Sequence, residues 1–79
     1  MSEPRLITTK LLVLVELEKK PMSTTELSSK LRVPQTTVYT ALKELRLLGL
    51  VEFNKETKTY SITEKGKHEL ESIRRLVGA

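Results

Sequence analysis

Five uncharged side chains that form hydrogen bonds lie at the start of one predicted helix, in a chain that is otherwise basic. The 79-residue chain has a formal net charge of +4, yet its lysines and arginines lie outside this run. Such groups donate and accept hydrogen bonds, and threonine adds a methyl group, which are the features that distinguish the edges of DNA base pairs. A merely solvated helix would more naturally carry Glu, Lys or Ala. We therefore predict contacts to DNA from Gln35, Thr36, Thr37, Tyr39 and Thr40.

Positive side chains flank this run, where they are suited to the phosphate backbone. Phosphate contacts fix the position of a protein on a duplex, whereas contacts to bases carry the sequence information. Thr24 and Thr25 open the preceding helix, and a helix N-terminus also attracts phosphate. Thr37 is equally suited to bonding the backbone of its own helix. The predicted phosphate contacts are Thr24, Thr25, Lys30, Arg32, Lys43, Lys55 and Lys58.

Helices are predicted on both sides of a short turn before this run. Residues 6–17 form an apolar helical segment. Ser23 and Glu26 fit a capping box, in which each side chain satisfies a free backbone N–H of the other. That short second helix should end near Leu31, because the residue before Pro34 is pushed away from helical angles.

The predicted third helix, residues 34–48, carries the uncharged run at its start. Val38, Leu42 and Leu45 recur at helical spacing, so their face should belong to the core. Gly49 is suited to the left-handed conformation that ends many helices. Two helices joined by a short turn, the second of which opens with polar residues, form the helix-turn-helix plan.

A hairpin and a last helix complete the predicted order. Residues 51–53 and 60–62 alternate apolar and polar side chains, and the polar segment 54–58 lies between them as a hairpin tip. Thr63 is suited to capping the last helix. We therefore predict an α+β fold, a single winged helix-turn-helix domain spanning residues 1–79 in the order α-α-α-β-β-α with a two-stranded wing.

Two segments resemble the winged helix-turn-helix transcription regulators of the MarR and PadR type. They are "MSTTELSSKLRVPQTTVYTALKELRLLGLVEF" and "KTYSITEKGKHEL". The resemblance implies sequence-specific binding of double-stranded DNA, with the third helix as a recognition helix in the major groove and the wing at the minor groove or backbone. Relative to the MarR pattern, the chain lacks the additional terminal helices that usually build the dimer and the ligand pocket, and no small-molecule effector is evident.

The first helix is apolar over more of its circumference than one core contact needs. At 100° per residue its apolar side chains span roughly 200°, whereas a single core-facing stripe needs somewhat over 100°. One alternative is that its own small domain wraps the helix on both sides. We favour a homodimer, to which the last helix contributes. The predicted interface residues are Leu6, Ile7, Val13, Leu17, Leu70, Ile73, Leu76 and Val77.

Composition argues against several other functions. The chain has no cysteine and one histidine, so a thiolate or zinc site is not expected. No set of nucleophile, histidine and carboxylate can be assembled, so we expect no catalysis and no cofactor. An apolar run of membrane-spanning length and a signal peptide are both absent, which favours the cytoplasm. The remaining rival is a winged-helix protein-interaction module of a larger assembly, which would have little need of the polar run.

Overall fold

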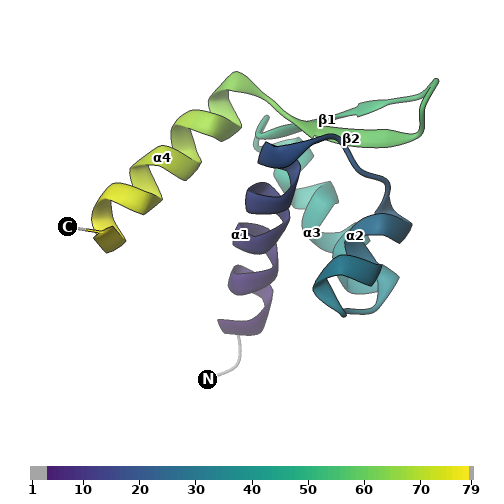
Figure 1. The fold of residues 1–79 in the computed structure, drawn as a ribbon, viewed down its shortest axis with the longest axis horizontal. Helices are drawn as coiled ribbons and strands as arrows, with labels where there is room; N and C mark the ends of the chain where they lie inside the picture. Colours follow the sequence, from purple (N-terminus) through teal and green to yellow (C-terminus); the bar gives the residue numbers. More distant parts are fainter. Residues whose placement is uncertain (1–3, 79) are drawn as a thin grey trace.

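The computed structural model describes the backbone of residues 4–78 and the side chains of residues 9–76. Within these residues, four helices and one antiparallel pair of strands follow the order α-α-α-β-β-α, as predicted (Figure 1). The elements are α1 (Pro4–Lys19), α2 (Thr24–Leu31), α3 (Gln35–Leu47), β1 (Val51–Asn54), β2 (Thr59–Ile62) and α4 (Glu64–Gly78). The chain therefore has the α+β winged-helix fold.

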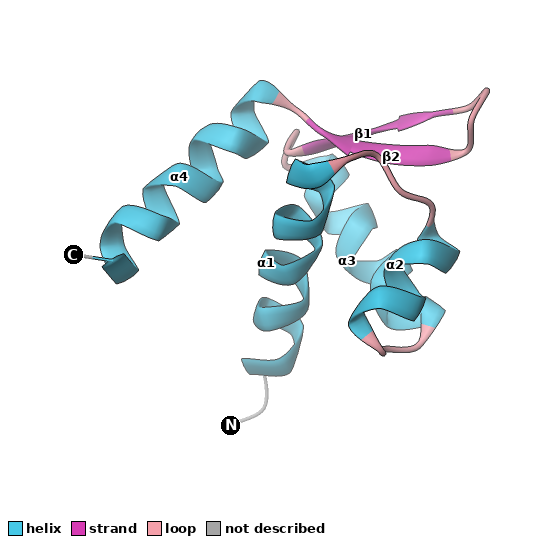
Figure 2. Ribbon diagram, in the orientation of Figure 1, coloured by secondary structure: helices cyan, strands magenta, loops and turns pink. Residues whose placement is uncertain are grey.

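The first three helices pack together, and the hairpin lies across one end of them. α3 packs against both α1 and α2, while β2 contacts α1. Figure 2 shows the hairpin extending to one side of the helices, while α4 leaves the sheet on the other side and diverges from α1. Two helices thus pack against α3, and β1 of the wing contacts it as well.

Local sequence signals set the ends of α2 and α3. The predicted capping box is present, since Ser23 Oγ accepts from Glu26 N–H and Glu26 Oε1 accepts from Ser23 N–H, both at 3.1 Å. Arg32 ends α2 in the left-handed region with φ of 57°. Gly49 follows α3 with φ of 77°, and its N–H donates to the carbonyl of Arg46 at 2.9 Å. The prediction for Gly49 is confirmed.

Three side chains assigned to the dimer interface belong instead to the core of this chain. Val13, Leu17 and Leu70 are exposed by 0%, 2% and 1%. They pack in one cluster with the inner residues of α3, so they offer no surface to a second copy, and their assignment is corrected. The alternative in which the domain covers much of its own first helix accounts for Val13 and Leu17, while Leu70 places α4 in the same core.

The other residues of the predicted interface are not part of the described core. Leu76 is 82% exposed and Ile73 is half-buried. The side chains of Leu6, Ile7 and Val77 lie outside the described residues. Apolar surface that could meet a partner therefore remains near the end of α4.

The hairpin is tied to the helices by a third extended segment. β1 and β2 pair with Val51 opposite Ile62 and Phe53 opposite Tyr60. Met22, between α1 and α2, exchanges two backbone hydrogen bonds with Tyr60, at 3.0 and 2.7 Å. The rings of Phe53 and Tyr60 lie 4.8 Å apart between centroids. These contacts fix the base of the wing against the helix-turn-helix.

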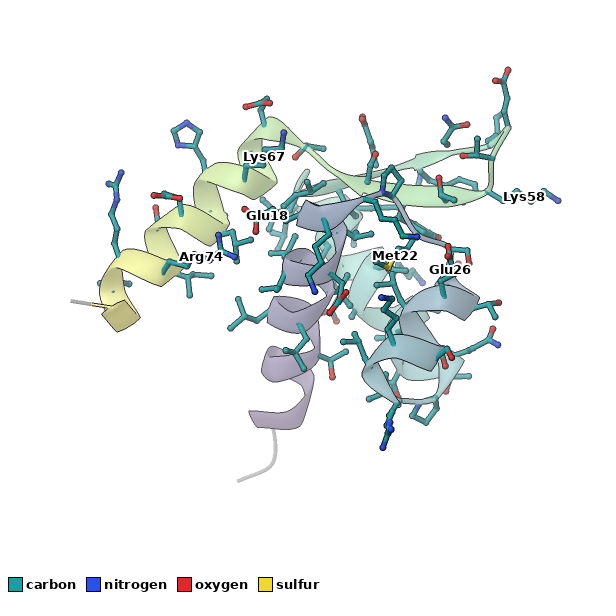
Figure 3. The ribbon with its side chains drawn as sticks, viewed as in Figure 1. Glu18, Met22, Glu26, Lys58, Lys67 and Arg74 are labelled. Atoms are coloured by element: carbon teal, nitrogen blue, oxygen red, sulfur yellow. The ribbon has the colours of Figure 1, made fainter. Side chains whose placement is uncertain are left out.

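An ion pair holds α4 to α1. Arg74 donates from both terminal nitrogens to the two carboxylate oxygens of Glu18, at 3.1 and 2.8 Å, and Figure 3 shows the two side chains facing each other. The hydrogen bonds to Glu18, and then its charge, raise the pKa of the Arg74 guanidinium. Arg74 is thus engaged in an inter-helix contact.

The start of α4 approaches Leu50, just before β1, and Ile62 of β2 so closely that it needs a glycine. Thr63 Oγ1 accepts from Gly66 N–H at 3.0 Å and donates to the carbonyl of Gly49 at 2.7 Å. A Cβ added at Gly66 would lie 2.2 Å from the carbonyl oxygen of Leu50 and 2.7 Å from Cγ1 of Ile62. The first of these neighbours is backbone, so relief requires a shift of α4 itself.

We predict that Gly66→Ala destabilises the protein although alanine favours helices. Overpacking of this kind costs about 1–3 kcal/mol, more than the helix propensity returns. Urea unfolding followed by circular dichroism measures the change, and Ser72→Ala, at an exposed position of the same helix, should stay within about 0.5 kcal/mol. A Gly66→Ala protein as stable as wild type would show that α4 does not pack this tightly.

Candidate nucleic-acid interface

The outer face of α3 presents the predicted reading residues to solvent. Gln35, Thr36, Tyr39 and Thr40 are exposed, with Tyr39 at 54%. The opposite face is held in the core by side chains that are at most 2% exposed, namely Val38, Ala41, Leu42 and Leu45. Because this inner face is buried, the polar side chains on the opposite face of α3 point into solvent.

A shallow groove collects these side chains together with the start of α2. It has a volume of about 500 Å³ and is lined by Thr24, Gln35, Thr36, Tyr39 and Thr40. Each of these five residues was predicted to contact DNA, and none carries a charge. Thr37 is half-buried and does not line the groove. We refer to this surface as the reading groove.

A second hollow lies beside the reading groove, between α3 and the wing. It has a volume of about 240 Å³ and is lined by Tyr39, Lys43, Arg46, Leu47 and Tyr60. Tyr39 borders both depressions, so the two form one continuous surface. This hollow carries two cations and none of the acidic residues.

Arg46 is the residue of this surface that the sequence analysis missed. Its guanidinium carbon lies 5.8 Å from the centre of the Phe53 ring, in the range of a cation–π contact. Its spacing was a usable signal, because positions three after Lys43 and seven after Tyr39 share a helix face. The contact with β1 orients the cation at the junction of recognition helix and wing.

The wing tip is a tight turn that displays its lysines. Asn54 Oδ1 accepts from the N–H groups of Glu56 and Thr57, at 2.8 and 3.2 Å. Lys58 adopts the left-handed conformation with φ of 58° and its N–H donates to the carbonyl of Asn54 at 2.7 Å. Both Lys55 and Lys58 are exposed, and Figure 3 shows Lys58 pointing away from the helices.

The remaining predicted contacts lie on α2 and the turn after it. Thr25, Lys30 and Arg32 are exposed, and Thr24 is half-buried at the rim of the reading groove. Lys30 and Arg32 lie at the opposite end of α2 from the threonines, so the two pairs are separated by the length of that helix.

Two further properties of the described residues bear on function. Residues 4–78 contain no group of three or more histidine and acidic side chains placed to hold a metal ion. In the same range, no helix has both the length and the apolar character needed to cross a membrane.

The sequence of this surface matches a known family of regulators. Residues 10–65, which include the whole helix-turn-helix and wing, match the family described as "Sugar-specific transcriptional regulator TrmB". The chain belongs to the TrmB family. The predicted winged helix-turn-helix domain thus belongs to a family described as transcriptional regulators, while a closer relation to the MarR or PadR families stays a prediction. No curated protein matches the chain.

Two solved structures resemble this TrmB-family chain. The transcriptional regulator BldR from Sulfolobus solfataricus superposes with a TM-score of 0.80 at 21% identity, over 89% of this chain and 54% of BldR. The ST1889 protein from Sulfolobus tokodaii gives a TM-score of 0.66 at 31% identity, over 89% of this chain and 78% of ST1889. The chain thus spans about half the length of BldR. At 21% identity, the similarity to BldR supports the fold alone.

We predict that the wing lysines of this TrmB-family protein contribute sequence-independent affinity. Lys55→Ala and Lys58→Asn should each lower the slope of log affinity against log salt by about one unit per subunit. Asparagine is chosen at Lys58 because it tolerates the left-handed conformation. Lys20→Ala, in the turn after α1, is the control for loss of net charge. An unchanged slope in the double variant would mean that the wing does not touch the DNA.

Proposed function

We propose that the protein binds double-stranded DNA sequence-specifically as a transcription regulator. In this proposal, residues 34–48 occupy the major groove, and the wing tip, residues 54–58, meets the minor groove or the backbone. The observation that carries it is the reading groove, an exposed and uncharged polar surface at the start of α3. Base edges in the major groove are distinguished by donors, acceptors and methyl groups, and this surface offers all three.

The surrounding cations support a division of labour between reading and anchoring. Lys43 and Arg46 line the hollow beside the reading groove, and Lys55 and Lys58 extend from the wing. Cations that contact phosphate provide affinity for any sequence and position the helix. Neutral side chains between them then discriminate among bases. This function requires no catalytic group, cofactor or small-molecule effector.

A protein-interaction module is the second candidate, and one observation favours it. Leu47 and Leu48, at the end of α3, are 82% and 54% exposed. A contiguous exposed apolar surface is typical of protein contacts, and these two leucines would contribute to one. Selection of bound sequences from a random DNA pool separates the candidates, because an interaction module would enrich no sequence.

We further propose that the regulator acts as a homodimer through the open face between α1 and α4. Leu12 is 41% exposed on α1, and Leu76 is 82% exposed on α4. A two-fold dimer would place two recognition helices in successive major grooves of a pseudo-palindromic site. Assembly would also stabilise a domain of 79 residues, which buries only a modest share of its surface alone.

We predict that Gln35→Ala and Tyr39→Ala narrow the gap between specific and non-specific affinity. Loss of a base contact should cost about 1–3 kcal/mol on the selected site and relax preference at that base pair. Affinity for unrelated DNA should hardly change, because the cations are untouched. Titrations against both DNAs measure the gap, and circular dichroism checks folding. If both variants keep the wild-type difference between specific and non-specific affinity, neither residue contacts a base.

We predict that light scattering at micromolar concentration gives twice the monomer mass of 9.0 kDa. Leu76→Glu should split the dimer, because it places a charge in the proposed interface without disturbing the core. Val13 is unsuited to this test, since it is fully buried in the chain itself. Glu69→Gln, at an exposed position of α4, is the control. A monomer at high concentration would rule out the homodimer.

A further inference from the structure

We propose that the reading groove recognises A·T base pairs, and that the methyl group of Thr40 contacts the C5-methyl group of a thymine. This inference rests on the proposed DNA-binding function and adds the class of sequence that is bound. Two observations carry it. The Thr40 hydroxyl already donates its proton within α3, and the cations line the hollow toward the wing rather than the reading groove.

The hydroxyl proton of Thr40 is already used within the helix. Thr40 Oγ1 donates to the carbonyl oxygen of Thr36 at 2.9 Å, and a hydroxyl has a single proton to give. The side chain is exposed and lines the reading groove. Toward a ligand it therefore presents a methyl group and an oxygen that can only accept.

A thymine methyl group is the major-groove feature that matches such a surface. Thymine alone among the four bases places a methyl group on that edge of the pair. Gln35 lines the same groove, and its amide can accept from and donate to adenine in a bidentate pair. The Tyr39 ring borders the groove as a further apolar surface. The lining thus offers partners for both bases of an A·T pair.

Partners for guanine are placed elsewhere. Guanine is read mainly by arginine or lysine, which donate to its O6 and N7 atoms. The five residues of the reading groove include no cation, and Lys43 and Arg46 line the adjoining hollow toward the wing. A G·C pair opposite the start of α3 would therefore leave its acceptors without charged donors.

The first test is the sequence recovered from a random double-stranded DNA pool, followed by removal of single methyl groups. The selected half-site should contain consecutive A·T pairs. Each thymine is then replaced by deoxyuridine, which lacks only the C5-methyl group. At one position, this replacement should weaken binding about fourfold, the ratio that corresponds to burial of one methyl group.

Two variants at Thr40 separate its methyl group from its hydroxyl. Thr40→Ser keeps the hydrogen bond to Thr36 and removes the methyl group, so the fourfold difference between thymine and deoxyuridine should vanish. Thr40→Val keeps a methyl group and removes the hydroxyl, so the difference should remain. Thr57→Ser, the same chemical change at the wing tip, is the matched control and should leave the difference unchanged.

The outcomes distinguish this inference from the function on which it rests. Specific binding to a G·C-rich half-site, or to an A·T-rich one that is indifferent to deoxyuridine, would overturn thymine recognition and leave specific DNA binding intact. Loss of the thymine preference in Thr40→Val rather than in Thr40→Ser would also overturn it. Failure to enrich any sequence would overturn both proposals.

Discussion

Burial of the inner face of α3 is the constraint on which the rest of the structure depends. Val38, Ala41, Leu42 and Leu45 are almost completely buried, and they fix the rotation of the helix about its axis against α1 and α2. With 100° between successive residues, that rotation alone decides that the start of the helix faces outward as a polar surface. An ion pair between Lys10 and Glu44 joins α1 to the last turn of the same helix. The core residues thus orient the polar surface of α3, although none of them belongs to that surface.

Much of this arrangement was predictable because its signals are local. Ser23 and Glu26 form their capping box within one turn, and Gly49 takes the one conformation in which a side chain is costly. The alternation of residues 60–62 likewise predicted a strand, which the structure confirms as β2. Such features depend on a few neighbouring residues, so their physics is complete within a short stretch of sequence.

The features that the sequence did not predict all depend on contacts between segments that are far apart in the chain. Periodicity shows that Val13 is apolar and inward-facing on its helix, but it cannot say whether the covering surface belongs to the same chain or to a second copy. Met22 pairs with Tyr60 across 38 positions, and Gly66 is needed because Leu50 and Ile62 lie against it. The position of the Arg46 guanidinium likewise depends on a residue of another element, the Phe53 ring of β1.

The contact between Arg46 and Phe53 links the anchoring surface to the reading surface mechanically. Phe53 lies on β1, its ring packs on Tyr60 of β2, and Tyr60 is tied through Met22 to the segment before α2. The wing, the Arg46 cation and α3 are therefore joined by a continuous series of contacts. On a duplex, phosphates held by the wing would set how α3 sits in the groove. The charges on the wing would thus set which base pairs lie opposite the uncharged side chains, and those side chains would discriminate among the bases.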